Sequence, residues 1–249
     1  MDKKIDVSGL ISSSVNFSMQ QNYVPVIRSL IIRNKSEDNL TDLTLRISFE
    51  PEFAKVYTYY IPAVAAGESV EISPVKIILS TEYLFSLTEK IVGIITIEVF
   101  CKDEKLYSSD SQIELLAYDQ WSGLRIMPEL IAAFVTPNHP IISEILTKAG
   151  DYLKLWTGSP SFTGYQTKNP DNVKKQMAAV YTALQSLNIA YNNPPASYED
   201  LGQRVRMPHV VIGQRLGTCL DLSVLYASCL EAAGLFPLIA FKRGHAYGG

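Results

Sequence analysis

The spacing of apolar residues changes its period near residue 120, and this change constrains the fold more than any other feature. Through residues 23–118, short segments rich in Val, Ile, Tyr and Thr are separated by polar turns. Residues 43–49 alternate apolar and polar side chains, which places one side of a strand in a core and the other in water. After residues 119–121 the apolar residues recur at helical spacing. The sequence therefore predicts an α+β protein with two domains, residues 1–120 and 121–249.

The first domain is expected to be an immunoglobulin-like β-sandwich. Further strands are predicted over residues 70–79, 91–100 and 113–117. The first of these is interrupted at Ser73-Pro74, which an edge or a bulge tolerates because proline has no N–H group. Six or seven short strands with polar turns fit a sandwich, and a barrel is the alternative.

The second domain is expected to be mainly helical. Helices are predicted to begin at Met127-Pro128-Glu129, at His139-Pro140 and at Asn169-Pro170-Asp171, since proline suits the first turn of a helix and asparagine is a favoured N-cap. The connecting loops over residues 159–169 and 192–203 are rich in Gly, Pro and Asn, so each is either a surface loop or part of a binding cleft.

Composition and charge exclude several classes of protein. Hydrophobic residues make up 47 % of the chain and charged residues 19 %, as in globular proteins that bury a core. The formal net charge of −3 argues against a broadly basic surface for nucleic acid or anionic membranes. No apolar run is long enough for a signal peptide or a spanning helix, so we expect a cytoplasmic protein that does not enter a membrane.

The cysteines and histidines do not have the spacing of a metal site, and no cofactor is expected. Cys101, Cys219 and Cys229 do not form an even-numbered disulfide framework and are interpreted as free thiols. Cys101 and Cys229 are expected to lie in the core. His139 and His209, each next to a proline, are interpreted as loop or cap residues.

Cys219 lies at the predicted start of a helix that ends before Gly234. Thr218 and Asp221 have the three-residue offset of a capping box, with Asp in place of Glu. If Thr218 is the N-cap, the free N–H groups of the first turn favour a thiolate at Cys219 and can hold an oxyanion. The alternative for a cysteine with apolar neighbours is a small buried hydrophobic residue.

The apolar run over residues 235–241 is predicted to be a buried strand that delivers His245 at its end or just beyond. A helix packed against this strand would bring His245 to Cys219. The imidazole could then accept the thiol proton and later protonate a leaving group.

The order Gly217-x-Cys219-x-Asp221, a helix, a short strand and Gly244-His245 resembles the transglutaminase-like (papain-like) cysteine hydrolase superfamily. The resemblance implies catalytic roles for Cys219 and His245 and a third acidic or amide residue on a following strand. That strand is expected beyond Gly249, so the domain is expected to be truncated before its sheet is complete. Thr218 and Asp221 are expected to support the helix that carries Cys219.

A longer resemblance covers PELIAAFVTPNHP, TGYQTKNP, YNNPPASYEDLGQRVRMP and RLGTCLDLSVLYASCLEAAGLFPL. These segments are similar to the N-terminal part of large uncharacterised bacterial proteins that often carry superfamily 1 helicase and nuclease-like modules further along. The resemblance implies that such modules are attached beyond residue 249. This chain itself has no G-x-x-x-x-G-K-[ST] phosphate loop, and direct nucleic-acid binding is not expected of it.

Two functions therefore remain open. In the first, the chain is a cysteine hydrolase or acyltransferase that acts on a peptide or another amide. In the second, it is an inactive interaction or regulatory module in a protein of DNA transactions or defence. Gln166, Gln203 and Gln214 are equal candidates for an oxyanion-binding amide, whereas Trp156 and Tyr165 are interpreted as cleft or core residues, with core favoured.

Overall fold

The computed structural model describes residues 4–194 and 202–249, which form two compact units. The first unit ends at Tyr118 and the second begins at Asp119, close to the boundary expected near residue 120. Both helices and strands are well represented, so the chain is an α+β protein.

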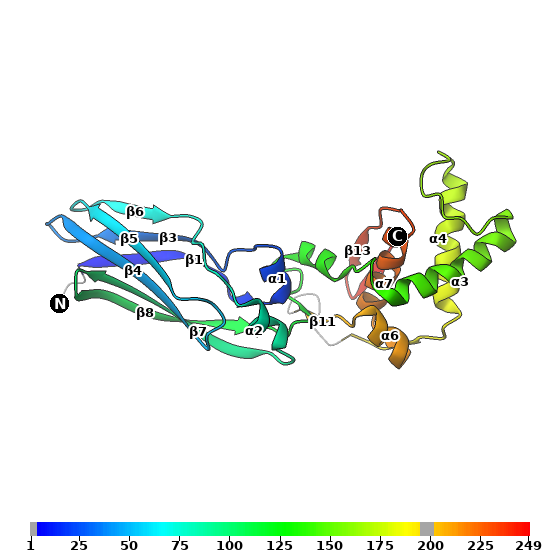
Figure 1. The fold of residues 1–249 in the computed structure, drawn as a ribbon. Coiled ribbons are helices and arrows are strands. Elements are labelled where there is room, and N and C mark those ends of the chain that lie inside the picture. The colour runs from blue at the N-terminus through cyan, green and yellow to red at the C-terminus, as the bar shows by residue number, and fades with distance from the viewer. Residues whose placement is uncertain (1–3, 195–201) are drawn as a thin grey trace. The chain divides into compact units, whose positions relative to one another are not determined.

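The first unit contains two sheets (Figure 1). One has five strands in the order β2-β8-β7-β4-β5, and the other has three in the order β1-β3-β6. Its elements are β1 (Ile5–Ile11), β2 (Ser14–Val15), α1 (Phe17–Gln21), β3 (Ile27–Asn34), β4 (Leu40–Glu50), β5 (Tyr57–Val64), β6 (Ser69–Ile72), α2 (Thr81–Ser86), β7 (Ile91–Cys101) and β8 (Glu104–Leu115).

The inward-facing residues of both sheets share one hydrophobic core. Strand β4 follows the alternation in its sequence, since Leu43, Leu45, Ile47 and Phe49 are buried and the residues between them are more exposed. Buried residues of β3, such as Leu30, belong to the same cluster as those of β4. The two sheets thus form two layers around a single core.

Two predictions for the first unit are wrong in detail. Strand β6 ends at Ile72, before Pro74, and Leu79 further along forms an isolated bridge with Ala54. Cys101 is the last residue of β7 and packs against the core but is only partly buried, with its Sγ 3.2 Å from the Thr41 carbonyl oxygen.

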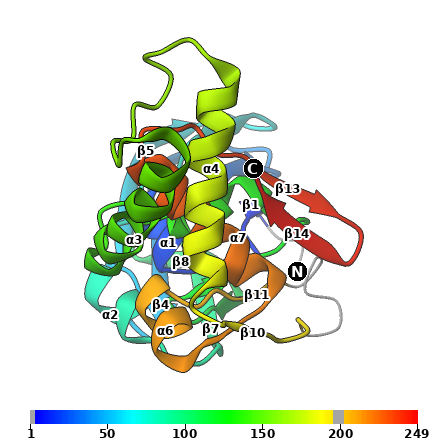
Figure 2. The same cartoon turned by 90° about the vertical axis from the view of Figure 1, so that its right-hand side faces the viewer.

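The second unit is mainly helical (Figure 2). Its elements are β9 (Gln120–Trp121), the 3-10 helix η1 (Pro128–Phe134), α3 (Pro140–Thr157), α4 (Pro170–Gln185), β10 (Ala190–Tyr191), β11 (Gln203–Arg204), α6 (Pro208–Gln214), β12 (Leu216–Gly217), α7 (Cys219–Ala232), β13 (Ile239–Lys242) and β14 (His245–Gly248). Its core joins buried residues of α3, α4 and α7, among them Ile142, Val180 and Leu225.

The ends of these helices follow from local sequence. His139 is the N-cap of α3, and Gly158 ends that helix with φ 81°, a left-handed conformation that suits glycine. Asn169 is the N-cap of α4 and accepts a hydrogen bond from the Asp171 N–H at 3.0 Å. Gly234, with φ 78°, follows the last turn of α7.

The prediction of a buried strand over residues 235–241 is wrong. Phe236 and Leu238 are 82 % and 77 % exposed, and strand β13 begins only at Ile239. Phe236 stacks on Tyr165 with 5.5 Å between ring centroids, so this apolar pair lies at the surface. Tyr165 and Trp156 are 46 % and 42 % exposed and are not core residues either.

In the described part of the chain, none of the helices combines the length and the apolar character needed to cross a bilayer. Part of the loop expected over residues 192–203, namely residues 195–201, lies outside the described residues.

Candidate functional site

Cys219 is the first residue of α7, and a capping box forms the start of this helix. The Thr218 Oγ1 accepts a hydrogen bond from the Asp221 N–H at 3.3 Å, and the Asp221 Oδ2 accepts one from the Thr218 N–H at 2.9 Å. The Leu222 N–H bonds to the Thr218 carbonyl oxygen. Among the described hydrogen bonds, the cap thus leaves the N–H groups of Cys219 and Leu220 directed out of the helix start.

The carboxylate of Asp221 also binds the segment that precedes α6. Its Oδ1 accepts the Arg206 N–H at 2.8 Å, and its Oδ2 accepts the Arg206 guanidinium at 2.8 Å. Asp221 is fully buried, so the cation offsets the cost of a carboxylate in the interior. One side chain therefore fixes both the start of α7 and the chain that approaches it.

Of the three candidate glutamines, Gln203 is the one that contacts the start of α7 within the described residues. Its Nε2 donates to the Thr218 Oγ1 at 3.0 Å, and its buried Oε1 has no hydrogen-bond partner within the described residues. Gln166 lines a separate pocket with Ala232 and Gly234, at the far end of α7, and Gln214 is the last residue of α6.

His245 is the first residue of β14, which pairs with β13 as a hairpin. Arg243 and Gly244 form the two-residue turn, and the φ of 74° at Gly244 suits a residue without Cβ. The other end of β14 packs against α7, where an added Cβ at Gly248 would lie 3.1 Å from the Ser223 carbonyl oxygen. The close approach of strand and helix holds His245 beside the N-terminal half of α7.

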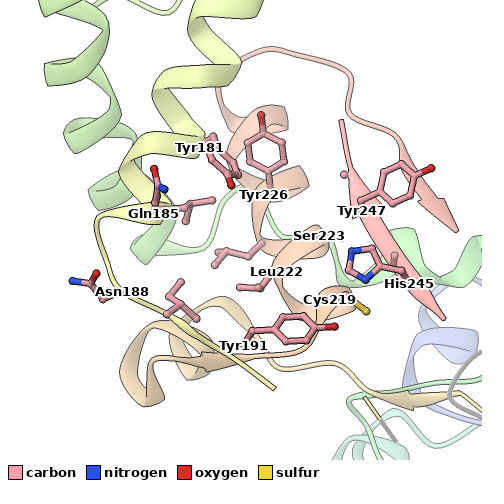
Figure 3. A pocket seen from close by; sticks show the side chains of 15 residues that line it. Tyr181, Gln185, Asn188, Tyr191, Cys219, Leu222, Ser223, Tyr226, His245 and Tyr247 are labelled. Carbon is pink, nitrogen blue, oxygen red and sulfur yellow. The ribbon is translucent and has the colours of Figure 1, made fainter. Parts of the chain in front are cut away.

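Cys219 and His245 line the same pocket, which has a volume of about 580 Å³ (Figure 3). We name it the Cys219 pocket. It is bounded by the C-terminal part of α4 and the segment after it, one face of α7, and β14. Cys219 is 3 % exposed, and His245 is exposed. The structure thus brings together the two residues to which the sequence assigns catalytic roles.

Tyr191 is a third residue of this pocket that sequence reasoning missed. Strand β10 pairs in parallel with β12, which places Tyr191 opposite Gly217, two residues before Cys219. Burial raises the pKa of the Tyr191 phenol, and the neighbouring Cys219 side chain raises it further. The phenol therefore keeps its proton and can donate it to the sulfur. An aromatic residue in a two-residue strand carries no local signal of this contact.

Cys229 is a core residue, as the sequence predicts. It is fully buried about three turns further along α7 and belongs to the hydrophobic cluster of the second unit. Burial raises the pKa of its thiol to about 12. Cys229 is therefore a thiol in the neutral range and not a competing nucleophile.

The two remaining histidines lie together, away from the Cys219 pocket. The His139 Nδ1 accepts the Ile141 N–H at 3.3 Å, and the His139 Nε2 lies 3.1 Å from the His209 Nδ1 with the two rings stacked. Within residues 4–194 and 202–249, no group of three or more His, Cys, Asp or Glu residues could hold a metal ion.

Comparisons with known proteins do not show a family for this chain. No protein-family model matches it, and no curated protein matches it. Solved structures resemble it only distantly. A FixG-related protein from Vibrio parahaemolyticus has a TM-score of 0.28 and 12 % identity, over 46 % of this chain and 96 % of that one.

Two other solved structures are similarly remote. The YadV chaperone has a TM-score of 0.23 and 13 % identity, over 45 % of this chain and 49 % of its own. A family 76 glycoside hydrolase from a bovine Bacteroides thetaiotaomicron strain has a TM-score of 0.23 and 9 % identity, over 92 % of this chain and 49 % of its own. Structural similarities with TM-scores this low do not support any inference about fold family or function.

Proposed function

We propose that the second unit is a transglutaminase-like cysteine hydrolase or acyltransferase domain that acts on a peptide or another amide. The single observation that carries this proposal is the meeting of Cys219, at the first position of α7, with His245 in one pocket. A thiol at a helix N-terminus beside an imidazole is an arrangement suited to nucleophilic catalysis. The two-layered first unit is proposed to be immunoglobulin-like.

In the proposed reaction the Cys219 sulfur attacks the carbonyl carbon of the amide, and His245 takes the thiol proton. The carbon–sulfur bond forms and the carbonyl oxygen becomes an oxyanion. The carbon–nitrogen bond then breaks, and the His245 proton goes to the leaving amine. Water releases the thioester in a hydrolase, and a second amine releases it in an acyltransferase.

The start of α7 is proposed to stabilise the oxyanion. The N–H groups of Cys219 and Leu220 are those that the cap leaves available, and the positive end of the helix dipole lies at the same place. The contact between Gln203 and Thr218 makes Gln203 the preferred of the three glutamines for an additional amide donor.

A second candidate function is a non-catalytic interaction or regulatory module, and one observation favours it. Within the described residues, neither ring nitrogen of His245 has a hydrogen-bond partner. A catalytic imidazole normally has an acceptor that fixes its tautomer and angle. In this case the pocket would bind a peptide of a partner, and the chain would regulate helicase and nuclease modules attached beyond Gly249 in a cytoplasmic protein.

Alkylation of the thiols tests the proposed nucleophile. We expect iodoacetamide at pH 6.5 to modify Cys219 at least about tenfold faster than a cysteine in an unstructured peptide, and His245→Ala to remove most of this advantage. Cys229 is the internal control, because its thiol lies in the hydrophobic cluster and does not line the Cys219 pocket, so it should remain unmodified in the folded protein. A rate at Cys219 equal to that of the peptide would contradict the proposal.

Comparison of variants in the intact protein separates the two functions. Cys219→Ser keeps the size of the side chain and removes the nucleophile. Loss of every biological output in this variant supports an enzyme. Unchanged output in Cys219→Ser, together with loss in a variant that fills the pocket, supports the interaction module.

A further inference from the structure

The residues of the Cys219 pocket indicate which amides the site accepts, an inference that rests on the proposed function. Apart from Cys219 and His245, the described residues that line the pocket are apolar, aromatic, amide, hydroxyl or glycine residues, and none of them is Asp, Glu, Lys or Arg. A charged side chain would lose water in such a pocket without gaining an opposite charge. The lining therefore selects against charged groups.

One face of α7 forms the floor of the pocket. Cys219, Leu222, Ser223 and Tyr226 follow one another at helical spacing on that face. Seven residues at about 1.5 Å of rise per residue separate Cys219 from Tyr226 by roughly 10 Å along the helix. This length corresponds to about three residues of an extended peptide at ~3.3–3.6 Å each.

The far end of this floor is aromatic (Figure 3). Tyr181 of α4 meets Tyr226 edge to face, with 6.3 Å between ring centroids. The Tyr226 hydroxyl donates to the Met177 carbonyl oxygen at 3.1 Å, and burial raises the pKa of Tyr226 to about 12. Because its hydroxyl is engaged, Tyr226 offers the pocket a ring surface that is already held in place.

Uncharged polar groups occur beside the apolar walls. Leu184 and Ile189 are partly buried against the core of the unit and present apolar surface to the pocket. Gln185 and Asn188 are exposed, line the same pocket and carry amide groups that can pair with a peptide backbone. Apolar walls with a few amide groups are typical of sites for uncharged ligands.

We propose that the substrate of this site is a peptide segment that lies extended along α7 and carries an aromatic or branched aliphatic side chain within three residues of the attacked carbonyl. That side chain packs against the rings of Tyr181 and Tyr226, and the backbone pairs with Gln185 and Asn188. Acidic and basic side chains at these three positions are disfavoured.

Peptide vinyl sulfones, which the Cys219 thiolate attacks at the alkene carbon, test this specificity. Probes would differ only at the three residues next to the electrophile, with Phe, Leu, Gly, Asp or Lys at each, and modification of Cys219 would be followed by mass spectrometry. Each rate is divided by the iodoacetamide rate of the same protein. We expect Phe or Leu at one position to raise this ratio at least about tenfold over Asp and Lys, as apolar pockets discriminate by ~10–200-fold.

A charge placed in the aromatic end of the pocket should shift this preference. For Tyr181→Lys we expect the normalised rate of the Phe probe, which we call the Phe ratio, to fall by at least about fivefold. The normalised rate of the Asp probe should rise. Tyr23→Lys is the matched control, because Tyr23 is 92 % exposed and belongs to the first unit. The control should keep the Phe ratio of the parent protein.

The outcomes distinguish this inference from the proposed function. The inference is overturned if Cys219 reacts with all probes at equal normalised rates, or fastest with the charged probes. The proposed role of Cys219 as a nucleophile is still supported in that case. No reaction of Cys219 with any reagent means that the proposed function fails. In that case saturation-transfer NMR on Cys219→Ser protein measures the binding of N-acetyl tripeptide amides that contain Phe, Asp or Lys. The absence of a preference for Phe overturns the inference.

Discussion

Arg206 donates a hydrogen bond from its guanidinium to the Asp221 Oδ2 at 2.8 Å, and this carboxylate is completely buried. The same carboxylate accepts the N–H groups of Thr218 and Arg206. The residue that caps the helix of the candidate nucleophile therefore depends on a cation fifteen residues earlier in the chain. A change that removes the Arg206 cation and leaves Asp221 charged should therefore destabilise the start of α7, where Cys219 lies.

Arg206→Leu tests this dependence. The substitution leaves a buried carboxylate without its cation, so we expect the free energy of unfolding to fall by about 3–5 kcal/mol, measured by urea denaturation. Lys174→Leu is the control, because its ion pair with Asp171 has both side chains about three-quarters exposed and should contribute less than about 1 kcal/mol. Equal losses in the two variants would contradict the role of Arg206.

Tyr191→Phe tests the contact between the phenol and the thiol. Burial, and then the neighbouring Cys219, raise the pKa of Tyr191, so the phenol stays protonated and would donate a hydrogen bond to a Cys219 thiolate. Without the hydroxyl we expect alkylation of Cys219 at pH 7 to slow by about tenfold, since a hydrogen bond to a charged group is worth ~1.5–3 kcal/mol. Tyr165→Phe, which changes a tyrosine of a different pocket, should keep the rate. A faster reaction in Tyr191→Phe would mean that the phenol only shields the sulfur.

Stability at alkaline pH tests the burial of Cys229. Its pKa is raised from 9.0 to about 12, so between these values the unfolded chain loses a proton that the folded protein retains. The free energy of unfolding is therefore unaffected by this group below pH 9, and it falls as the pH rises towards 12, by about 1.4 kcal/mol per pH unit. Tyr226, raised from 10.0 to about 12, acts in the same direction.

Urea denaturation at pH 8, 9.5 and 10.5 measures this dependence. Cys229→Ala should be less stable than the parent at pH 8, because it leaves a small cavity, and its stability should decrease less steeply above pH 9. Identical slopes in the two proteins would show that Cys229 ionises in the folded state as easily as in the unfolded chain.

Gly248→Val tests the packing that holds His245 in place. An added Cβ at Gly248 would lie 3.1 Å from the Ser223 carbonyl oxygen, so a branched side chain must push β14 away from α7. We expect the effect of His245 on the alkylation of Cys219 to be lost. Gly249→Val is the matched control, because an added Cβ there meets no atom within 4 Å. If Gly248→Val keeps the parent rate, β14 does not position the imidazole.

Much of the local structure can be predicted from the chain alone, because it depends on residues within a few positions of one another. The offset of Thr218 and Asp221 predicts a capping box, and both of its hydrogen bonds are present. The alternation over β4 predicts which of its residues are buried, and Asn169 and Gly158 mark helix ends. Periodicity and caps act within one or two turns, so they leave a clear pattern in the sequence.

The same reasoning fails where burial depends on neighbours far along the chain. The run over residues 235–241 has the composition of an internal strand, yet Phe236 and Leu238 are exposed, since no described layer covers them. Trp156 and Tyr165 are exposed for the same reason. Hydrophobicity predicts that a side chain favours burial, but not whether another element is placed to bury it.

The candidate site contains both local features, set by neighbouring residues, and contacts between elements that are distant in the chain. The sequence alone determined that Cys219 begins a capped helix, because the capping residues Thr218 and Asp221 are its neighbours in the chain. The tertiary structure decided that His245 and Cys219 line one pocket, that Tyr191 lies beside the sulfur, and that Arg206 supports Asp221. These contacts join elements that are distant in the chain, and only the packing of α4, β10 and β14 around α7 brings them together.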